Sequence, residues 1–176
     1  MFSAREVWDT IRLRSEEVNW VDSVWFPQCI PRHAFHMWLL LRKKLKTHEN
    51  MRCWDVGGAA TNHNLLVCSL CKAGPDSHEH MFFGCAYSSQ VWHLVRDLPG
   101  MANISSNWSD IMNWLESNSK SKSASAIIGK ICVAATAYYI WQERNQRTFA
   151  NKVRTAAQLQ DIIVQTIRYR MVSLRF

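Results

Sequence analysis

The sequence predicts an all-α protein: a helical domain with a small zinc turn of the Cys-Cys-His-Cys type and a C-terminal helix pair. Apolar residues recur every three to four positions in several segments, as amphipathic helices require. No stretch alternates polar and apolar residues for long enough to predict a strand. Apolar residues make up 48% of the 176 residues, which is enough for a packed core, and cysteines with metal-ligand spacing fall in the middle of the chain.

Aromatic and proline positions predict the first elements. Val7, Trp8 and Ile11 fall on one face of a short helix. The aromatic-rich segment 20–26 precedes two prolines and is expected to form an extended anchor. The second of these prolines, Pro31, suits the first turn of a new helix because its missing N–H would have no intrahelical partner there.

The helix that begins at Pro31 has a clear apolar face. Its inward residues are expected to be Phe35, Trp38, Leu41 and Leu45. Basic residues at 42–46 are expected in its last turn, where cations suit the negative end of the helix dipole. Thr47 is then predicted to cap a short second helix that runs through Trp54.

Four helices are predicted after the zinc turn. Ser88 or Ser89 can cap the first, which ends before Pro99, and Asn107 can cap the second. A long helix is predicted at about 126–149 and a last one at about 155–172, both from their apolar periodicity.

These elements divide the chain into three predicted parts. Residues 1–116 form a zinc-binding helical domain, with the zinc turn at about 65–86. Residues 117–125 are dominated by serine and lysine and are expected to form a polar linker. Residues 126–176 form a basic C-terminal helix pair.

The predicted metal site consists of Cys68, Cys71, His80 and Cys85. A Cys-x2-Cys pair can face one cation from a tight turn, and a later His-x4-Cys can complete the tetrahedron that zinc prefers. His78 is an alternative third ligand, because its spacing to both sides would also close the site. Four protein ligands leave no position for water, so we expect one structural Zn²⁺ rather than a catalytic one. Six cysteines in a chain of this length are too few to predict a disulfide framework.

No catalytic motif accompanies this site. The sequence has no phosphate-binding glycine loop, no His-Glu-x-x-His arrangement and no paired aspartates of the kind that polymerases use. We therefore expect a protein that is not an enzyme.

The net charge of +7 is concentrated near the C-terminus. Residues 130–176 carry eight Lys and Arg against two acidic residues. Such a surface suits a polyanion, so RNA or DNA is the expected partner. The candidate contact residues are the basic side chains of the early helix and of the tail: Arg42, Lys43, Lys44, Lys46, Arg144, Arg147, Lys152, Arg154, Arg168 and Arg170.

The N-terminal region also bears on location. Charged residues interrupt the first segment, so no secretory signal is predicted. The longest nearly apolar run, Ile131 to Trp141, is shorter than a membrane span. We expect an intracellular protein of the nucleus or cytoplasm that is neither secreted nor inserted in a membrane.

Several motifs carry a family resemblance. They are Pro31-Arg32-His33, Cys68-x2-Cys71, His80-Met-Phe-Phe-Gly-Cys85, Val91-Trp92 and the tail that begins at Trp141-Gln-Glu-Arg-Asn. With these motifs, residues 5–95 resemble the zinc-binding domain that follows the polymerase in plant non-LTR (LINE-type) retrotransposon reverse transcriptases. The resemblance places the third ligand at His80 and implies a role in holding RNA or DNA.

The same resemblance suggests a stand-alone C-terminal fragment, because polymerase, endonuclease and RNase H motifs are absent from the sequence. We therefore expect a non-enzymatic zinc module that contacts RNA or DNA through basic and aromatic residues. The alternative is a protein–protein scaffold that docks a polymerase domain or a second copy of itself, or a non-functional remnant whose zinc only stabilises the fold.

Overall fold

The computed structural model describes residues 7, 10–11, 18–51 and 67–174. The helices are α2 (Val21–Val24), α3 (Pro31–Leu41), α4 (His48–Met51), α5 (Ala86–Val95), α6 (Trp108–Ser117), α7 (Ala124–Phe149) and α8 (Ala156–Ser173), with a π-helical turn, η3, at His80–Gly84. The all-α class predicted from the sequence is confirmed. The described segments contain no strand, and only an isolated bridge joins Val67 to Pro75.

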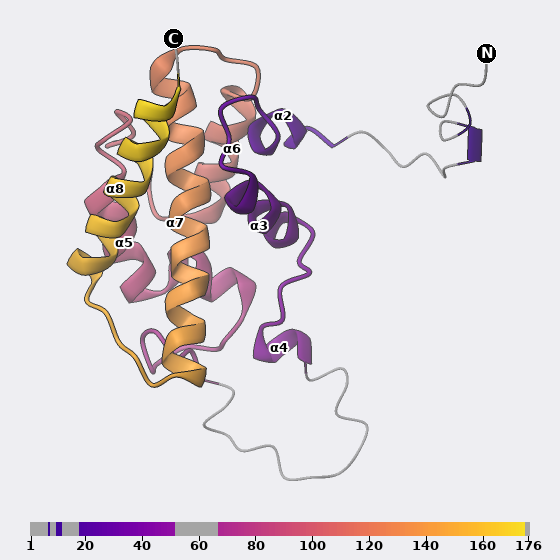
Figure 1. Ribbon diagram of the computed structural model, residues 1–176. Coiled ribbons are helices and arrows are strands. Elements are labelled where there is room, and N and C mark those ends of the chain that lie inside the picture. The colour runs from indigo at the N-terminus through magenta and orange to yellow at the C-terminus, as the bar shows by residue number, and fades with distance from the viewer. Residues whose placement is uncertain (1–6, 8–9, 12–17, 52–66, 175–176) are drawn as a thin grey trace.

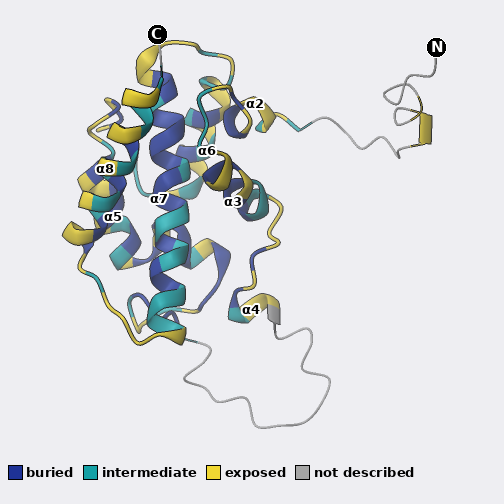
Figure 2. Ribbon diagram, viewed as in Figure 1, coloured by how far each residue is buried: buried dark blue, intermediate teal, exposed yellow. Residues whose placement is uncertain are grey.

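Helix α7 is the centre of the packing. It contacts α2 and α3 on one side and α5 and α8 on the other, as Figure 1 shows. Much of α7 is buried, as the dark blue ribbon in Figure 2 shows. Ile131, Val133 and Ile140 are almost completely removed from solvent. Burial of so many apolar side chains supplies the main stabilising free energy of the fold.

The two ends of the chain share this core. The buried cluster contains residues of α3 and η3 together with Leu159, Ile163 and Ile167 of α8. Within the predicted linker 117–125, only residues 118–123 lie between α6 and α7. This segment is held by hydrogen bonds: Ser123 caps α7, and Lys130 Nζ donates to the carbonyls of Ser119 and Ser121 at 3.0 and 3.2 Å.

Helix α3 begins at Pro31, as the sequence predicts, but its buried face differs from the expected one: Ala34, Met37 and Leu40 are buried, whereas Phe35 is exposed and Trp38 and Leu41 are only partly buried. The helix also ends earlier than expected. Lys44 N–H donates to Leu39 O and Lys43 N–H to Leu40 O, and Lys43 has a φ of 52°. This pair of bonds is a Schellman motif with lysine in the left-handed position that glycine usually takes. The basic residues 42–46 therefore form an exposed loop between α3 and α4, apart from the buried Leu45, and not the last helical turn. We call this segment the basic loop.

The N-terminal predictions are only partly tested. Val7 and Ile11 are helical and exposed, while most residues of that first helix, including Trp8, lie outside the described part. The segment 20–26 is not extended: it contains α2, which buries Val24 and whose Ser23 hydroxyl donates to Leu115 O at 2.7 Å. A contact with a distant helix, which local pattern cannot reveal, favours the helical turn.

The predicted cap of α6 is present: Asn107 accepts a bond from Ser109 N–H. Thr155 with Gln158 forms a reciprocal capping box on α8 that was not predicted. Thr47 accepts from Asn50 N–H at the start of α4, whose predicted continuation to Trp54 lies outside the described residues.

The capping prediction for α5 is wrong. This helix begins at Ala86 with Cys85 at the cap position and no side-chain cap. The buried Ser88 hydroxyl donates to Met81 O at 2.6 Å, which ties the helix to the turn before it. The chain therefore passes directly from a predicted metal ligand into the helix.

Helix α7 has the length and composition of a membrane-spanning helix, although its longest nearly apolar run is shorter than a span. Most of its apolar window is buried against the other helices of this chain. Its apolar character is explained by its central position in the core.

Candidate metal centre

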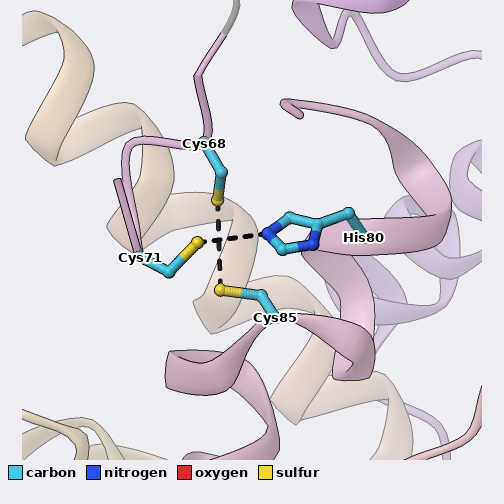
Figure 3. Close-up of side chains that lie close together, drawn as sticks. All are labelled: Cys68, Cys71, His80 and Cys85. Atoms are coloured by element: carbon cyan, nitrogen blue, oxygen red, sulfur yellow. Dashed lines mark hydrogen bonds between the residues drawn. The ribbon is translucent and has the colours of Figure 1, made fainter. Parts of the chain in front are cut away.

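The turn that carries the first two cysteines is closed by backbone hydrogen bonds. Cys68 N–H donates to Gly74 O at 2.7 Å, and Lys72 N–H donates to Cys68 O at 2.8 Å. Lys72 adopts a left-handed φ of 60°, which reverses the chain directly after Cys71. The two cysteine side chains consequently point to the same side of the turn (Figure 3).

The second pair of ligands comes from η3 and the start of α5. Phe83 has a φ of 67°, an uncommon value for a bulky residue. Its ring is fully buried, stacks on Trp108 at 5.8 Å and meets the edge of Trp92 at 5.3 Å. This packing holds the strained residue in place, and the resulting bend brings His80 and Cys85 toward one point.

Four ligand atoms meet at this point (Figure 3). One atom from each of Cys68, Cys71, His80 and Cys85 lies within 4.8 Å of all the others. Cys68 Sγ is 4.0 Å from Cys85 Sγ, and Cys71 Sγ is 3.2 Å from His80 Nε2. Among the described residues no other such cluster occurs, and no disulfide is formed.

This arrangement fits a zinc ion. Zn–S bonds of about 2.3 Å and Zn–N bonds of about 2.0–2.1 Å give ligand separations of roughly 3.3–3.8 Å in a tetrahedron. The observed separations bracket these values, and the three sulfurs and one imidazole form a structural donor set. The chain therefore holds one structural zinc site, as predicted.

The environment of Cys85 favours the thiolate form that binds metal. The thiol of Cys68 hydrogen-bonds to Cys85, which lowers the pKa of Cys85 to about 5 and raises that of Cys68. Backbone N–H groups of Tyr87 and Ser88 add to the lowering at Cys85. These amides stand at the N-terminus of α5, where unpaired N–H groups favour a negative charge.

The choice between the two histidines is resolved by the geometry. His80 directs Nε2 into the cluster. His78 is buried elsewhere, with Nδ1 3.5 Å from the Thr47 hydroxyl and its ring near Phe82. The structure thus brings His80, and not His78, to the cysteines.

Gly74 is required by the close approach of His80. A Cβ built on Gly74 would lie 2.4 Å from Cε1 of the His80 ring, and 2.8 Å from Nε2. The contact shows that the backbone at Gly74 forms one wall of the metal site.

We expect Gly74→Ala to weaken zinc binding by at least about tenfold, comparable to the removal of a group that orients a metal ligand. The added methyl would push the imidazole out of the cluster. Competition with a metal chelator measures the change, and Ala73→Ser, at an exposed neighbouring residue, is the control. Unchanged affinity in Gly74→Ala would show that the ring can move at no cost.

Two arginines of α7 fasten the cysteine turn to the core. The Arg144 guanidinium pairs with the carboxylate of Asp76, whose Oδ2 also lies 2.8 Å from His48 Nδ1. Arg147 donates to Leu70 O at 2.7 Å and pairs with Glu143 at 2.8 Å. Of these partners, Leu70 and Asp76 belong to the segment of the cysteine turn, and Glu143 lies on α7.

We call these contacts of Arg144 and Arg147 the clamp. They were not predicted from the sequence. The sequence feature that could have indicated the clamp is the pair Glu143 and Arg144. These two charges are adjacent near the end of a helix whose other positions are largely apolar. Both are fully or almost fully buried, and buried charges in proteins are nearly always paired.

The candidate nucleic-acid contacts separate into two groups. Arg144 is only 1% exposed, Arg147 and Arg154 pair with Glu143, and Arg170 donates to the carbonyls of Gln28 and Cys29. These four residues have structural partners, and burial removes Arg144 from any phosphate. The exposed residues are Arg42, Lys43, Lys44, Lys46, Lys152 and Arg168.

Comparison with known families agrees with the metal site. Residues 2–92 match the family described as zinc-binding in reverse transcriptase. The chain belongs to this family. Only this zinc-binding domain is matched, and no polymerase domain is found. No curated protein and no solved structure matches the chain. Within the family's region the ligands Cys68, Cys71, His80 and Cys85 all occur, and the clamp residues of α7 lie beyond it.

Proposed function

We propose that this protein is a non-enzymatic, zinc-stabilised module that binds RNA or DNA. The observation that carries the proposal is the basic loop, which presents Arg42, Lys43, Lys44 and Lys46 on the surface directly after α3. Several exposed cations within one short segment attract a polyanion and release its counterions on binding.

The loop is held by its surroundings. The Schellman motif fixes its start, and the side-chain amide of Asn50 donates to the carbonyls of Lys43 and Leu45 at 3.0 and 3.1 Å. The carboxylate of Glu79 lies 3.4 Å from Lys43 Nζ, and both side chains are largely exposed. An exposed pair of this kind contributes little free energy and leaves Lys43 available to a phosphate.

We also propose that the domain derives from a plant LINE-type element and works inside the cell, where its family partner domains act on nucleic acid. The family match supports a reverse-transcriptase origin. The resemblance in sequence motifs supports the narrower plant and LINE-type assignment. The zinc site then maintains the fold that presents the basic loop.

The proposal is tested with the double variant Lys44→Gln/Lys46→Gln. We expect weaker binding to both single-stranded RNA and DNA, because phosphate contacts carry little sequence information. The slope of log K against log salt should decrease by roughly 0.7 for each phosphate of the single strand that is no longer neutralised. Fluorescence anisotropy at several salt concentrations measures both quantities.

Lys120→Gln/Lys122→Gln is the matched control, because it removes the same charge from exposed positions between α6 and α7. We expect it to have a much smaller effect. Equal weakening by the two variants would indicate only a diffuse attraction to net charge. The absence of any salt-dependent binding by the zinc-loaded chain would overturn the proposed function.

A further inference from the structure

A groove with a volume of about 410 Å³ lies between α3 and α7. The two helices run in the same direction here, since His33 of α3 stacks on Tyr138 and His36 lies near Trp141. Leu45 of the basic loop lines the groove beside Asn145 and Gln146, and Arg32 lines it near Tyr138. Arg32 therefore places a cation in the groove lining, and Leu45 joins the groove to the basic loop, whose charged side chains lie outside the lining.

Aromatic rings line the groove between these ends. Phe35 is 53% exposed although it is a large apolar side chain on a helix that faces the core. Tyr138 and Trp141 are half-buried on the α7 side. Phe82, two residues after the metal ligand His80, stacks behind Trp141 at a centroid distance of 6.4 Å. Packing of Phe82 against Trp141 therefore connects the metal turn to the wall of the groove.

A buried histidine also borders the groove. His36 lines the groove, is only 6% exposed, and has no hydrogen-bond partner on either ring nitrogen. Burial lowers its pKa to about 4, so the ring is neutral near pH 7 and offers one donor and one acceptor. Because both ring nitrogens are buried, the ring contributes a neutral wall to the groove rather than a hydrogen-bonding group.

Aromatic faces together with the amides of Gln142, Asn145 and Gln146 are groups that can hold an unstacked nucleobase. Amide side chains can pair with the edges of bases, while rings stack on their faces. Arg32 in the lining and the cations of the adjoining basic loop suit the phosphates of such a strand.

We propose that this groove receives a base of single-stranded RNA or DNA whose backbone follows the basic loop. The inference rests on the proposed function and adds a site to it. Phosphates bind at residues 42–46 and near Arg32, and a base stacks on Phe35 between them. A single strand is preferred to a duplex because a paired base cannot leave its stack without a cost.

The test compares a uridine decamer with an abasic decamer that has the same number of phosphates. We expect the zinc-loaded chain to bind the uridine decamer roughly 5- to 150-fold more tightly, the range for stacking of one base on an aromatic ring. Phe35→Ala should remove most of this preference and leave the salt slope unchanged. Phe35→Tyr, which retains an aromatic face, should keep the preference.

Direct evidence comes from photocrosslinking of an oligonucleotide that contains 5-iodouridine. We expect crosslinked peptides to include Phe35, Tyr138 or Trp141. Zinc content and the thermal midpoint of each variant show that the fold is intact, which is expected because Phe35 is exposed.

The outcomes separate this inference from the proposed function. Salt-dependent binding with equal affinity for both decamers would retain the proposed function and overturn the groove as a base site. This is the result expected if the groove accepts a protein segment instead of a base. An unchanged preference in Phe35→Ala would also overturn it. No binding of either decamer would overturn both.

Discussion

Replacement of Cys85 with serine should remove zinc and destabilise the whole fold. Structural zinc in small domains binds with an apparent free energy of about 10–16 kcal/mol, and part of this is folding free energy. We expect the free energy of unfolding to fall by more than about 4 kcal/mol, a decrease characteristic of a missing metal or an equally severe defect. Metal analysis and chemical denaturation of the purified variant measure these effects.

The destabilisation should spread beyond the ligands. Cys85 joins the metal site to α5, and the turn at Cys68 is bound to α7 through Arg144 and Arg147. Hydrogen exchange after chelation should therefore show reduced protection at 68–95 and also at the C-terminal end of α7. The centre of α7, which packs against α3 and α8, should retain more protection.

Cys29→Ser is the matched control. Cys29 is a half-buried cysteine outside the metal cluster, so the variant makes the same chemical change without removing a ligand. We expect it to keep one zinc and nearly the original stability. A Cys85→Ser protein with full zinc content, or with protection unchanged by chelation, would contradict a structural role for this site.

The metal site could be predicted from the sequence because its determinants are local. Cysteine spacing, Gly74 and the short step from His80 to Cys85 all lie within one segment, and zinc restricts the geometry that they can adopt. The choice of His80 over His78 needed the family resemblance. Only the three-dimensional structure shows the bend at Phe83 that directs His80 inward.

Helix ends and roles of charged residues were less predictable. The end of α3 depends on Lys43 in a left-handed conformation, for which lysine gives no sequence signal. The segment 20–26 contains a helical turn in which Ser23 donates a hydrogen bond to a carbonyl 92 residues away. The local sequence does not reveal this contact. From the sequence, Arg144 was expected to be a surface charge, because its buried partner Asp76 is 68 residues away.

Arg144 gives the second large prediction. Its guanidinium and the carboxylate of Asp76 are both almost inaccessible to solvent. Removing one partner of such a pair leaves a buried charge without compensation. The neighbouring His48 has a pKa that burial lowers and Asp76 raises, so in the native protein Arg144 is the main cation at this carboxylate.

We therefore expect Arg144→Met to lower the free energy of unfolding by about 3–5 kcal/mol. For a chain of this size, that corresponds to a decrease in thermal midpoint of roughly 6–20 °C. Urea denaturation measures the change in stability. Arg168→Gln is the control, since this exposed arginine on α8 should change stability by no more than about 0.5 kcal/mol.

The same pair of variants separates a structural role for Arg144 from the phosphate contact that the sequence suggested. If Arg144 has a structural role, Arg144→Met should show a large decrease in stability. Where the variant chain remains folded, its salt slope for RNA binding should be unchanged. A phosphate-binding residue predicts the reverse: normal stability and a slope reduced by roughly 0.7 for the one phosphate that is no longer neutralised. Because the Arg144 side chain is 2% exposed and paired, we expect the first result, and the second would show that the ion pair opens to bind nucleic acid.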